Sequence, residues 1–221
     1  MIIVAGGSGK RMGSDIPKQF LPINGKPLLM RTIERINTYD GSIKIILVLP
    51  EHQEEYWKLL CREYNFDLPL KIVYGGKERF FSVKNALQHI PENSIVGIHD
   101  GVRPFVSNDT LDRLFDALET SDAVIPAITP VESVRIQYDN DSSEMLDRNR
   151  IKLIQTPQCF KSDIVKKAYN TDYIQTFTDD ASVVENMLKT KITIVEGNRE
   201  NIKITTAFDL MISEEIYKVN L

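Results

Sequence analysis

Short apolar segments alternate along this chain with longer segments in which apolar residues recur every three or four positions. The short segments are bounded by polar or glycine-rich stretches and predict β-strands, whereas the longer ones predict amphipathic helices. We expect strands at residues 2–4, 43–49, 70–73, 94–98 and 123–127. We expect helices at about residues 27–37, 52–64, 80–89 and 108–119, the first with Pro27 in its first turn. This alternation predicts an α/β fold with a doubly wound, mostly parallel sheet.

The pattern changes after Pro130. Residues 131–138 and 144–148 alternate as extended strands do, and the turn-forming sequence DNDSS separates them. We interpret residues 131–148, approximately, as a protruding β-hairpin arm, which buries little by itself. Packing against a second copy of the chain would cover it, so we expect a homodimer. An excursion folded back onto its own domain is the alternative.

The last third of the chain returns to the sheet. Pro157 is expected to end a strand in IKLIQTPQCF, and Thr178 to cap the second of the helices that follow. Lys203 should point away from its neighbours Ile202 and Ile204, toward either the solvent or a site. These last elements are helices at about residues 161–170, 179–188 and 207–219 and a strand at 192–196. With no linker between two compositions, we expect a single domain over residues 1–221.

The composition, with 42% hydrophobic and 26% charged residues among 221, is that of an ordinary globular protein. The longest purely apolar run, IILVL at residues 45–49, is too short to span a membrane, and the first residues form a strand rather than a signal peptide. We therefore expect a cytoplasmic protein with no membrane partner. Cys61 and Cys159 are too few for a zinc cluster or a disulfide framework, and we interpret both as small packed side chains.

A glycine-rich turn with several cations follows the first strand, in the sequence AGGSGKRMG that continues to SDIPKQF. Its glycines allow successive backbone N–H groups to form an anion-binding concavity. Lys10, Arg11 and Lys18 make the segment basic within a chain of net charge −4, which indicates a small polyphosphate rather than a nucleic acid as the ligand. An ordinary strand-to-helix turn with solvated lysines is the alternative.

The spacing in this turn fits neither of two common nucleotide-binding motifs. Met12 stands where G-x-G-x-x-G requires its third glycine, which disfavours a nicotinamide-dependent oxidoreductase. Lys10 follows Gly6 too closely for G-x-x-x-x-G-K-[ST] and precedes Arg11, which disfavours a Walker-type NTPase.

Two further segments follow predicted strands and should reach the same edge of the sheet: GGKERFFS at residues 75–82 and HDGVRPF at 99–105. Asp100 could bind a magnesium ion or a ribose hydroxyl, and Arg103 a phosphate, or the two could merely fix the loop. Arg79 could contact the ligand, or pair with Glu78 or another surface carboxylate. We interpret His99 as a packed histidine, since no second His or Cys lies at metal spacing.

The glycine-rich turn with PKQF, the HDGVRPF turn, the TPQ triplet and the NIKITT segment, in this order, resemble the family of 2-C-methyl-D-erythritol 4-phosphate cytidylyltransferases over nearly the whole chain. The resemblance implies a Rossmann-like nucleotidyltransferase fold. It implies transfer of CMP from CTP to a sugar-alcohol phosphate, with release of pyrophosphate, in non-mevalonate isoprenoid precursor synthesis. It also implies bound Mg²⁺ or another divalent cation, with Asp100 as a ligand. Because charge builds on the α-phosphate and the leaving pyrophosphate, positioning and cation placement would carry catalysis.

The same resemblance implies roles for individual residues. The catalytic residues would be Arg11, Lys18 and Lys203. Contacts with the nucleotide would come from Ala5, Gly6, Gly7, Gly9, Gly76, Ser82, Asp100, Gly101 and Arg103. The sugar phosphate would be bound by Ser133, Arg148, Thr156 and Lys203, with the two arm residues reaching the site of the neighbouring subunit.

The chain departs from the family pattern in two places. Glu132 and Ser133 stand where members often carry Asp-Thr; serine keeps the hydroxyl donor but lacks the methyl group that stiffens the threonine rotamer. The HDGVRP turn departs in a direction shared with ribitol 5-phosphate cytidylyltransferases, which make CDP-ribitol and are the first alternative. A nucleotide-binding module that has lost catalysis is the second, and the cations together with Asp100 argue against it.

Overall fold

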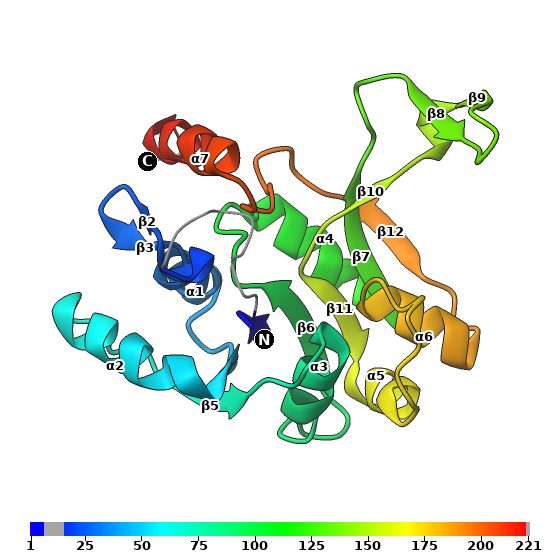
Figure 1. Cartoon of the computed structure of the whole chain (residues 1–221). Helices are drawn as coiled ribbons and strands as arrows, with labels where there is room; N and C mark the ends of the chain where they lie inside the picture. The colour runs from blue at the N-terminus through cyan, green and yellow to red at the C-terminus, as the bar shows by residue number, and fades with distance from the viewer. Residues whose placement is uncertain (7–15, 220–221) are drawn as a thin grey trace.

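The structure is a computed structural model that describes residues 1–6 and 16–219 (Figure 1). Within these residues one sheet has eight strands, in the order β10-β7-β11-β6-β1-β4-β5, and β12 pairs with β7. These strands are β1 (Ile2–Val4), β4 (Ile45–Leu49), β5 (Leu70–Tyr74), β6 (Ile95–Asp100), β7 (Ala123–Ile128), β10 (Leu153–Ile154), β11 (Gln158–Lys161) and β12 (Thr193–Glu196). Only β10 and β11 pair antiparallel within this sheet, so the expected mostly parallel sheet is confirmed.

Helices form where apolar residues recur at helical spacing. They are α1 (Leu28–Tyr39), α2 (Glu54–Glu63), α3 (Arg79–Leu87), α4 (Asn108–Leu118), α5 (Ser162–Tyr169), α6 (Asp180–Leu188) and α7 (Ala207–Val219). Short 3-10 turns stand at η2 (Lys18–Phe20), η3 (Glu51–Gln53) and η4 (Arg148–Arg150). Every expected helix is present, with ends that differ by a few residues at most. None of the helices in the described residues is long and apolar enough to cross a membrane.

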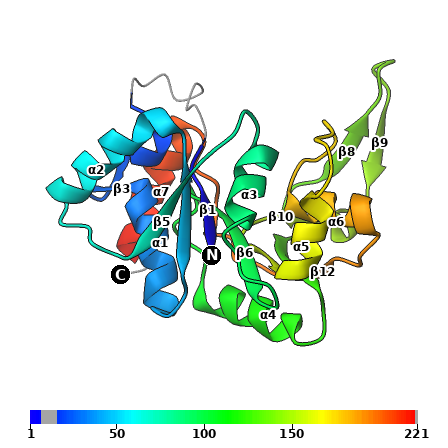
Figure 2. The ribbon, with the colours of Figure 1, turned by 90° about the horizontal axis from the view of Figure 1, so that it is seen from below.

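Side chains of β1 alternate between two apolar cores, as the period-two geometry of a strand requires. Ile3 packs in a core with α1, α2 and α4, whereas Ile2 packs in a core with α3, α5 and α6. Figure 2 shows α1 and α3 on opposite sides of β1. Helices therefore cover both faces of the sheet, which is the doubly wound arrangement that the sequence predicts.

A third, smaller core lies beneath α7 and includes Val102, Phe105 and Ile204. The backbone N–H of Ile204 donates to the carbonyl oxygen of Val102 at 3.0 Å. This bond ties the segment around Lys203 to the loop that follows β6. The side chain of Lys203 is 42% exposed while Ile204 is fully buried, so the two point in opposite directions as expected.

The strand β6 extends two residues beyond the expected end at Ile98. Its last residues, His99 and Asp100, pair with Ile3 and Val4 of β1. Asp100 is therefore the final residue of a strand and not part of the following turn. Its position is set by the sheet, which is more rigid than a loop.

A short hairpin that the sequence analysis did not predict precedes α1. Its strands, β2 (Pro22–Ile23) and β3 (Lys26–Pro27), are joined through Asn24 and Gly25, whose φ angles are 45° and 73°. An Asn-Gly pair adopts such angles readily and favours a two-residue hairpin turn. Pro27 accordingly ends this hairpin and precedes α1, so its expected place in the first helical turn is wrong.

Two expected boundaries in the last third are also wrong. Pro157 does not end a strand, because β11 begins directly after it at Gln158. The N-cap of α6 is Asp179 rather than Thr178. The Asp179 carboxylate accepts from the backbone N–H of Ser182, and the Ser182 hydroxyl oxygen accepts from the backbone N–H of Asp179. This reciprocal capping box satisfies two backbone donors at once.

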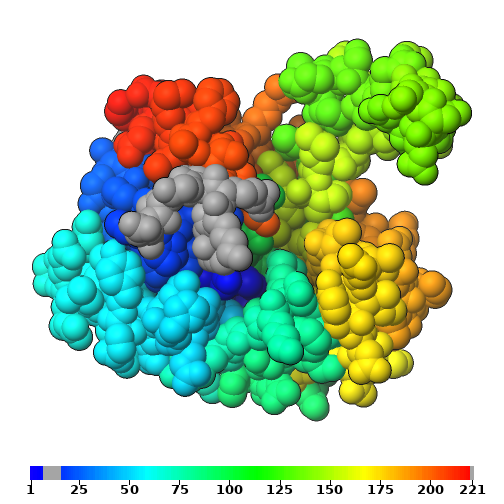
Figure 3. Space-filling view, viewed as in Figure 1, coloured from blue at the N-terminus to red at the C-terminus, as the bar shows by residue number. Residues whose placement is uncertain are grey.

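The expected β-hairpin arm is present as β8 (Val134–Gln137) and β9 (Ser143–Leu146), an antiparallel pair with Val134 opposite Leu146. Figure 3 shows the arm extending away from the body of the molecule. Its apolar side chains are exposed, Ile136 by 42% and Met145 by 69%. Within the described part of the chain, the arm thus has little apolar surface covered.

Candidate functional site

A pocket of about 350 Å³ lies at the carboxyl ends of β1 and β6, where a doubly wound sheet binds its ligands. We call it the Asp100 pocket. Eight of the residues singled out in the sequence line it: Ala5, Gly6, Lys18, Gly76, Arg79, Ser82, Asp100 and Lys203. The fold therefore gathers residues from the first loop, the loop before α3, the end of β6 and the segment before α7.

Asp100 faces three cations. Its Oδ2 lies 3.1 Å from Nζ of Lys203 and 3.2 Å from Nε of Arg103, and its Oδ1 lies 3.7 Å from Nε of Arg79. Burial alone would raise the pKa of Asp100, but the charges of Arg79, Lys203 and Arg103 lower it well below its usual range. The carboxylate is therefore ionised, and positive charge remains in excess around it.

A hydrogen-bond network beneath Asp100 fixes its backbone. We assign the proton of His99 to Nε2, because this nitrogen lies 2.9 Å from the carbonyl oxygen of Arg103, which can only accept. Nδ1 then accepts from the hydroxyl of Thr156 at 2.9 Å, and that hydroxyl oxygen accepts from the backbone N–H of Asp100 at 3.0 Å. Burial lowers the pKa of His99 to about 4, so its ring is neutral. His99 is a packed histidine, as expected.

The loop before α3, residues 75–78, is held by a hydroxyl of that helix. We call it the base-side loop, because the resemblance implies that Gly76 and Ser82 contact the nucleotide on the side of its base. The Oγ of Ser82 accepts from the N–H of Gly76 at 3.1 Å and donates to the carbonyl of Glu78 at 3.2 Å. A methyl group on Gly76 would lie 2.4 Å from Cβ of Phe81, and one on Gly75 would lie 2.9 Å from Oγ of Ser82. Glycine at these two positions lets the backbone approach α3 closely.

Lys18 reaches the pocket from η2, a turn anchored by its other two residues. Phe20 is buried in the core, and Nε2 of Gln19 donates to the carbonyl of Ala5 at 3.0 Å and to Oε1 of Gln53 at 2.6 Å. These bonds tie Lys18 to the end of β1. Gln19 lines the pocket too, although the sequence analysis did not single it out.

Arg79 lines the pocket and pairs with a buried carboxylate rather than with Glu78 or another surface carboxylate. Its two terminal nitrogens donate to the two oxygens of Asp180, at 2.7 Å and 2.6 Å. Asp180 lies 101 residues away in the sequence and is completely buried. No sequence pattern connects the two residues, so this partner was not predicted.

Three predicted binding residues lie behind Asp100 and do not line the pocket. Thr156 belongs to the network described above, and Nη1 of Arg103 donates to the carbonyl of Asn201 at 2.7 Å. A methyl group on Gly101 would lie 3.0 Å from Cβ of Ala5. These residues support the site from beneath; that they also contact a ligand stays a prediction.

The other predicted residues lie elsewhere. Ser133 and Arg148 belong to the arm and do not line the pocket, and Nη1 of Arg148 donates to the carbonyl of Val131. Gly7, Gly9 and Arg11 lie outside the described residues. One chain therefore brings together part of the expected nucleotide side of the site and Lys203 of the expected sugar-phosphate side, whereas Ser133 and Arg148 lie apart on the arm.

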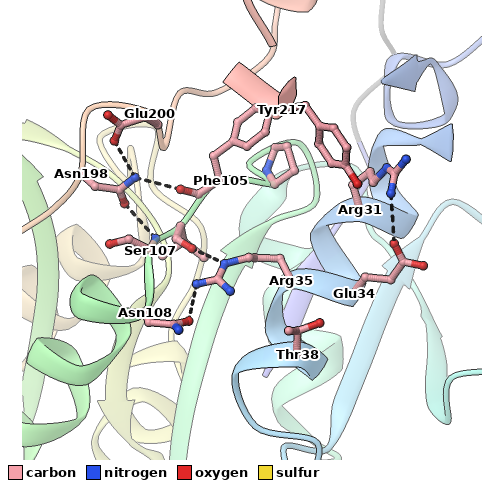
Figure 4. Close-up of a pocket in the computed structure, with 12 residues that line it drawn as sticks. Arg31, Glu34, Arg35, Thr38, Phe105, Ser107, Asn108, Asn198, Glu200 and Tyr217 are labelled. Atoms are coloured by element: carbon pink, nitrogen blue, oxygen red, sulfur yellow. Dashed lines mark hydrogen bonds and ion pairs between the residues drawn. The ribbon is translucent and has the colours of Figure 1, made fainter. Parts of the chain in front are cut away.

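A second cavity, of about 500 Å³, lies between α1, the loop after β6 and α7 (Figure 4). We call it the α7 cavity. Arg35 crosses it and donates to the carbonyl of Val106 and to Oδ1 of Asn108. Nδ2 of Asn198 donates to Glu200 and to the carbonyl of Phe105. None of the candidate residues lines this cavity in the part of the chain that is described, and several of its polar groups bond to one another.

The Asp100 pocket is basic although the chain as a whole is acidic. Among the described residues that line it, the cations are Lys18, Lys77, Arg79 and Lys203, and the anions are Glu78 and Asp100. An excess of cations in a concave site attracts anionic ligands. Glycine-rich backbone beside these side chains adds N–H donors for phosphate oxygens. The arrangement can thus bind a polyphosphate and stabilise negative charge that develops on it.

No group of three or more His, Cys, Asp or Glu side chains within residues 1–6 and 16–219 could hold a metal ion by itself. Magnesium, however, commonly binds through one or two carboxylates, substrate phosphates and water. Asp100 is an ionised carboxylate at the edge of a cationic pocket, and this donor set fits magnesium bound together with a polyphosphate.

Comparisons with known proteins agree with the sequence resemblance. The family model for 2-C-methyl-D-erythritol 4-phosphate cytidylyltransferase matches residues 1–218. Curated proteins of that name from Phocaeicola vulgatus and Clostridium perfringens are 54% and 40% identical to the chain, over 97% and 98% of it and 97% of each relative.

Solved structures agree as well. The 4-diphosphocytidyl-2C-methyl-D-erythritol synthase of Anaerococcus prevotii superposes with a TM-score of 0.83 at 28% identity, covering 98% of this chain and 96% of that one. The 2-C-methyl-D-erythritol 4-phosphate cytidylyltransferase of Francisella tularensis superposes with a TM-score of 0.77 at 33% identity, covering 100% and 98%. The similarity therefore extends over the whole chain in sequence and in fold.

Proposed function

Because the chain belongs to the 2-C-methyl-D-erythritol 4-phosphate cytidylyltransferase family, we propose that the Asp100 pocket is where it transfers CMP from CTP to 2-C-methyl-D-erythritol 4-phosphate. The observation that carries this assignment is the excess of cations around the ionised Asp100. A triphosphate would complete the charge balance of such a pocket. The activity is that of a CTP-dependent nucleotidyltransferase that supplies isoprenoid biosynthesis.

The transfer moves the cytidylyl (CMP) group from one oxygen atom to another. A phosphate oxygen of the sugar-alcohol phosphate attacks the α-phosphorus of CTP, and the bond to the β-phosphate breaks, so that its electron pair leaves with pyrophosphate. Negative charge builds on the α-phosphate oxygens and on the leaving group. We assign Lys18 and Lys203, together with Arg11, to the stabilisation of that charge, since fixed cations act most strongly where charge develops.

The nucleotide would bind along the glycine-rich backbone of the pocket. We propose contacts from Ala5 and Gly6 on one side and from Gly76 and Ser82 on the other, both supported by their place in the pocket lining. Gly7, Gly9, Gly101 and Arg103 would complete the nucleotide contacts. Two glycines in the base-side loop would allow backbone groups to reach the base.

We further propose that Mg²⁺ or another divalent cation binds at Asp100 together with the triphosphate. When bound, this ion would neutralise phosphate charge and orient the phosphates for in-line attack. The Thr156 hydroxyl, itself bonded to the His99 ring, holds the backbone N–H of Asp100, and Arg79, Arg103 and Lys203 hold its carboxylate in a fixed direction. The cations around it keep that carboxylate ionised at neutral pH.

We propose that the arm completes the site of a second copy in a homodimer. Ser133 and Arg148 would bind the sugar phosphate there, opposite Thr156 and Lys203. Support comes from the exposed apolar side chains of the arm, among them Val131, which is 52% exposed. One domain spanning residues 1–221, with the arm at about 131–148, and a cytoplasmic location complete the proposal.

A pyrophosphate-release assay with CTP tests this function directly. We expect release with 2-C-methyl-D-erythritol 4-phosphate, and much less with ribitol 5-phosphate, because the curated relatives carry the methylerythritol name. A sugar 1-phosphate serves as the third acceptor. Release only with ribitol 5-phosphate would reassign the substrate, and no release with any acceptor would overturn the enzymatic assignment.

The shared site is tested by mixing two inactive variants. Arg148→Ala and Lys203→Ala homodimers should each be inactive, whereas a mixture should recover part of the activity, since some mixed dimers keep one intact site. Lys18→Ala mixed with Lys203→Ala is the matched control, because both lie in the same pocket lining of one chain. Recovery in neither mixture, despite heterodimers detected by mass spectrometry, would contradict the shared site.

A further inference from the structure

Asp180 is a carboxylate with no exposed surface that nonetheless lies next to the Asp100 pocket. It is the first residue of α6, and both of its oxygens accept from Arg79. Its Oδ1 also accepts from the hydroxyl of Tyr169 at 2.6 Å. A buried carboxylate is tolerated only when it is paired and hydrogen-bonded, and three short bonds meet that need here.

Arg79 contacts a second carboxylate with the remaining edge of the same guanidinium. Its Nε lies 3.7 Å from Oδ1 of Asp100, while its two terminal nitrogens are engaged by Asp180. A pair of parallel hydrogen bonds to one carboxylate fixes the plane of the guanidinium. The direction in which Nε points is therefore set by Asp180. One side chain thus connects the end of β6 with the start of α6.

The same residue also terminates the base-side loop. Arg79 begins α3, directly after Glu78, whose carbonyl accepts from Ser82. Its neighbour Phe80 stacks on Tyr169 with ring centroids 4.8 Å apart and planes inclined by 15°. Asp180 and Tyr169 together therefore hold the first turn of α3.

The separation between Arg79 and Asp100 is longer than those of the other two cations. Lys203 and Arg103 lie 3.1 Å and 3.2 Å from Asp100, but Arg79 lies 3.7 Å away because its terminal nitrogens bond to Asp180. Without Asp180 the guanidinium could turn and pair fully with Asp100, since opposite charges at this distance attract. Asp180 thus limits how strongly Arg79 pairs with Asp100.

From these contacts we infer that Arg79 is a positioning residue for the transfer reaction, held by the buried Asp180 so that it sets the geometry of both Asp100 and the base-side loop. The inference rests on the proposed function of the Asp100 pocket. Arg79 itself donates no proton and attacks no atom. Its effect on turnover passes through Asp100 and through the loop that would hold the nucleotide.

The variant Asp180→Asn tests this role, because it keeps the shape of the side chain and lies outside the pocket. We expect kcat/KM for CTP to fall roughly 10- to 100-fold, which is the usual effect of losing a group that orients a functional residue. Arg79→Lys, which keeps the charge but loses the paired bonds, should cause a fall of the same order. In the double variant kcat/KM should fall little further than in either single variant, since both substitutions disrupt the same Arg79–Asp180 pair.

Val183→Ala is the matched control for loss of stability. Val183 belongs to the same helix, is 1% exposed and lies in the core under α6, so its truncation should lower the melting temperature without moving Arg79. We expect its kcat/KM for CTP to stay within about twofold of the wild type. Tyr169→Phe removes one of the three bonds to Asp180. Its kcat/KM for CTP should lie between that of this control and that of Asp180→Asn.

Thermal shift with CTP provides a readout independent of turnover. The melting temperature of Asp180→Asn should rise less with CTP than that of the wild type, whereas Val183→Ala should keep the full rise. A folded Asp180→Asn enzyme with wild-type kcat/KM and CTP shift would overturn the inference. So would a Val183→Ala enzyme with an equal loss of kcat/KM. If Asp180→Asn does not fold, Arg79→Lys decides by the same criteria. A wild-type chain that releases no pyrophosphate would contradict the proposed function instead.

Discussion

The Asp100 pocket and the α7 cavity differ in how their charges are matched. The α7 cavity is the larger, at about 500 Å³ against about 350 Å³, but the charged side chains that line it in the described residues are two cations, Arg31 and Arg35, and two anions, Glu34 and Glu200. Among the described residues that line the Asp100 pocket, the four cations Lys18, Lys77, Arg79 and Lys203 outnumber the two anions Glu78 and Asp100. Unmatched charge, and not volume, therefore distinguishes the site that needs an anionic ligand to be complete.

Replacing Lys18 or Lys203 by alanine should have the largest effect and should separate the two cavities most clearly. We expect kcat to fall on the order of 100- to 1,000-fold, because each cation would stabilise charge that appears only in the transition state. The dissociation constant for CTP should change far less. Steady-state pyrophosphate release and calorimetric CTP binding measure the two quantities. Equal losses in both would mean that the lysines only hold ground-state phosphate.

The substitution Asp100→Asn tests the same comparison by making the net charge of the Asp100 pocket more positive. The substitution removes the carboxylate that faces Arg79, Arg103 and Lys203, and so increases the positive excess in the pocket. Turnover should fall by a factor of about 10 to 100 if Asp100 orients a metal-bound triphosphate. Binding of CTP in the presence of EDTA should be unchanged or tighter, since no attraction to phosphate is lost. Calorimetry that finds weaker metal-free binding would show that Asp100 holds the nucleotide directly.

Acidification should affect the Asp100 pocket before it affects the α7 cavity. His99, the group that takes up a proton, lies beneath the Asp100 pocket and not beneath the α7 cavity. The folded pKa of His99 is about 4, below its ordinary value of about 6.5, so the unfolded chain binds the proton more readily. The contribution of the neutral His99 ring to the free energy of unfolding is thus fully present above pH 6.5. It is lost, by roughly 3 kcal/mol, as the pH falls toward 4. The lowered pKa of Asp100 extends this loss to more acidic pH.

Urea unfolding at pH 7 and at pH 4.5 measures this loss. The variant His99→Gln has no ring to protonate and should lose less stability between the two pH values than the wild type does. An equal loss in both proteins would mean that the neutral ring of His99 contributes nothing to the acid sensitivity of the fold.

Arg35→Ala should have the smallest effect on the reaction. Losing its hydrogen bonds in the α7 cavity should cost about 1–2 kcal/mol of stability, which corresponds to a melting temperature lower by roughly 2–8 °C. The kcat/KM for CTP should stay within about twofold of the wild type. Differential scanning fluorimetry and the pyrophosphate assay check both numbers. A loss of turnover close to that of Lys18→Ala would mean that the α7 cavity takes part in the reaction.

The sequence predicted the sheet and its two helical layers because burial imposes a period that can be read from the residues. Ile2 and Ile3 belong to opposite cores, and their order in the sequence already implies this. Boundaries were less predictable. The hairpin through Asn24 and Gly25 has a known signal, but strands of two residues are too short to show a period. Asp179 and Thr178 are both good caps, and only the bond to Ser182 decides between them.

The candidate site was predictable where it follows strands and unpredictable where it depends on distant partners. Lys18, Asp100 and Lys203 stand in recognisable segments, and the sheet brings those segments together. The bond between Arg79 and Asp180 joins residues whose spacing and neighbours carry no common signal. Such pairs arise from packing between helices, which a single sequence does not record.

The Asp100 pocket combines residues from near both ends of the chain: Ala5 follows β1, and Lys203 precedes α7. A ribosome produces the first of these residues long before the last, and a domain generally folds as a unit. Contacts between residues so far apart also form slowly. A nascent chain that stops before residue 203 could already contain β1, β4 and β6 but would lack one of the cations at Asp100. Nucleotidyl transfer would therefore be among the last properties that a newly made molecule acquires.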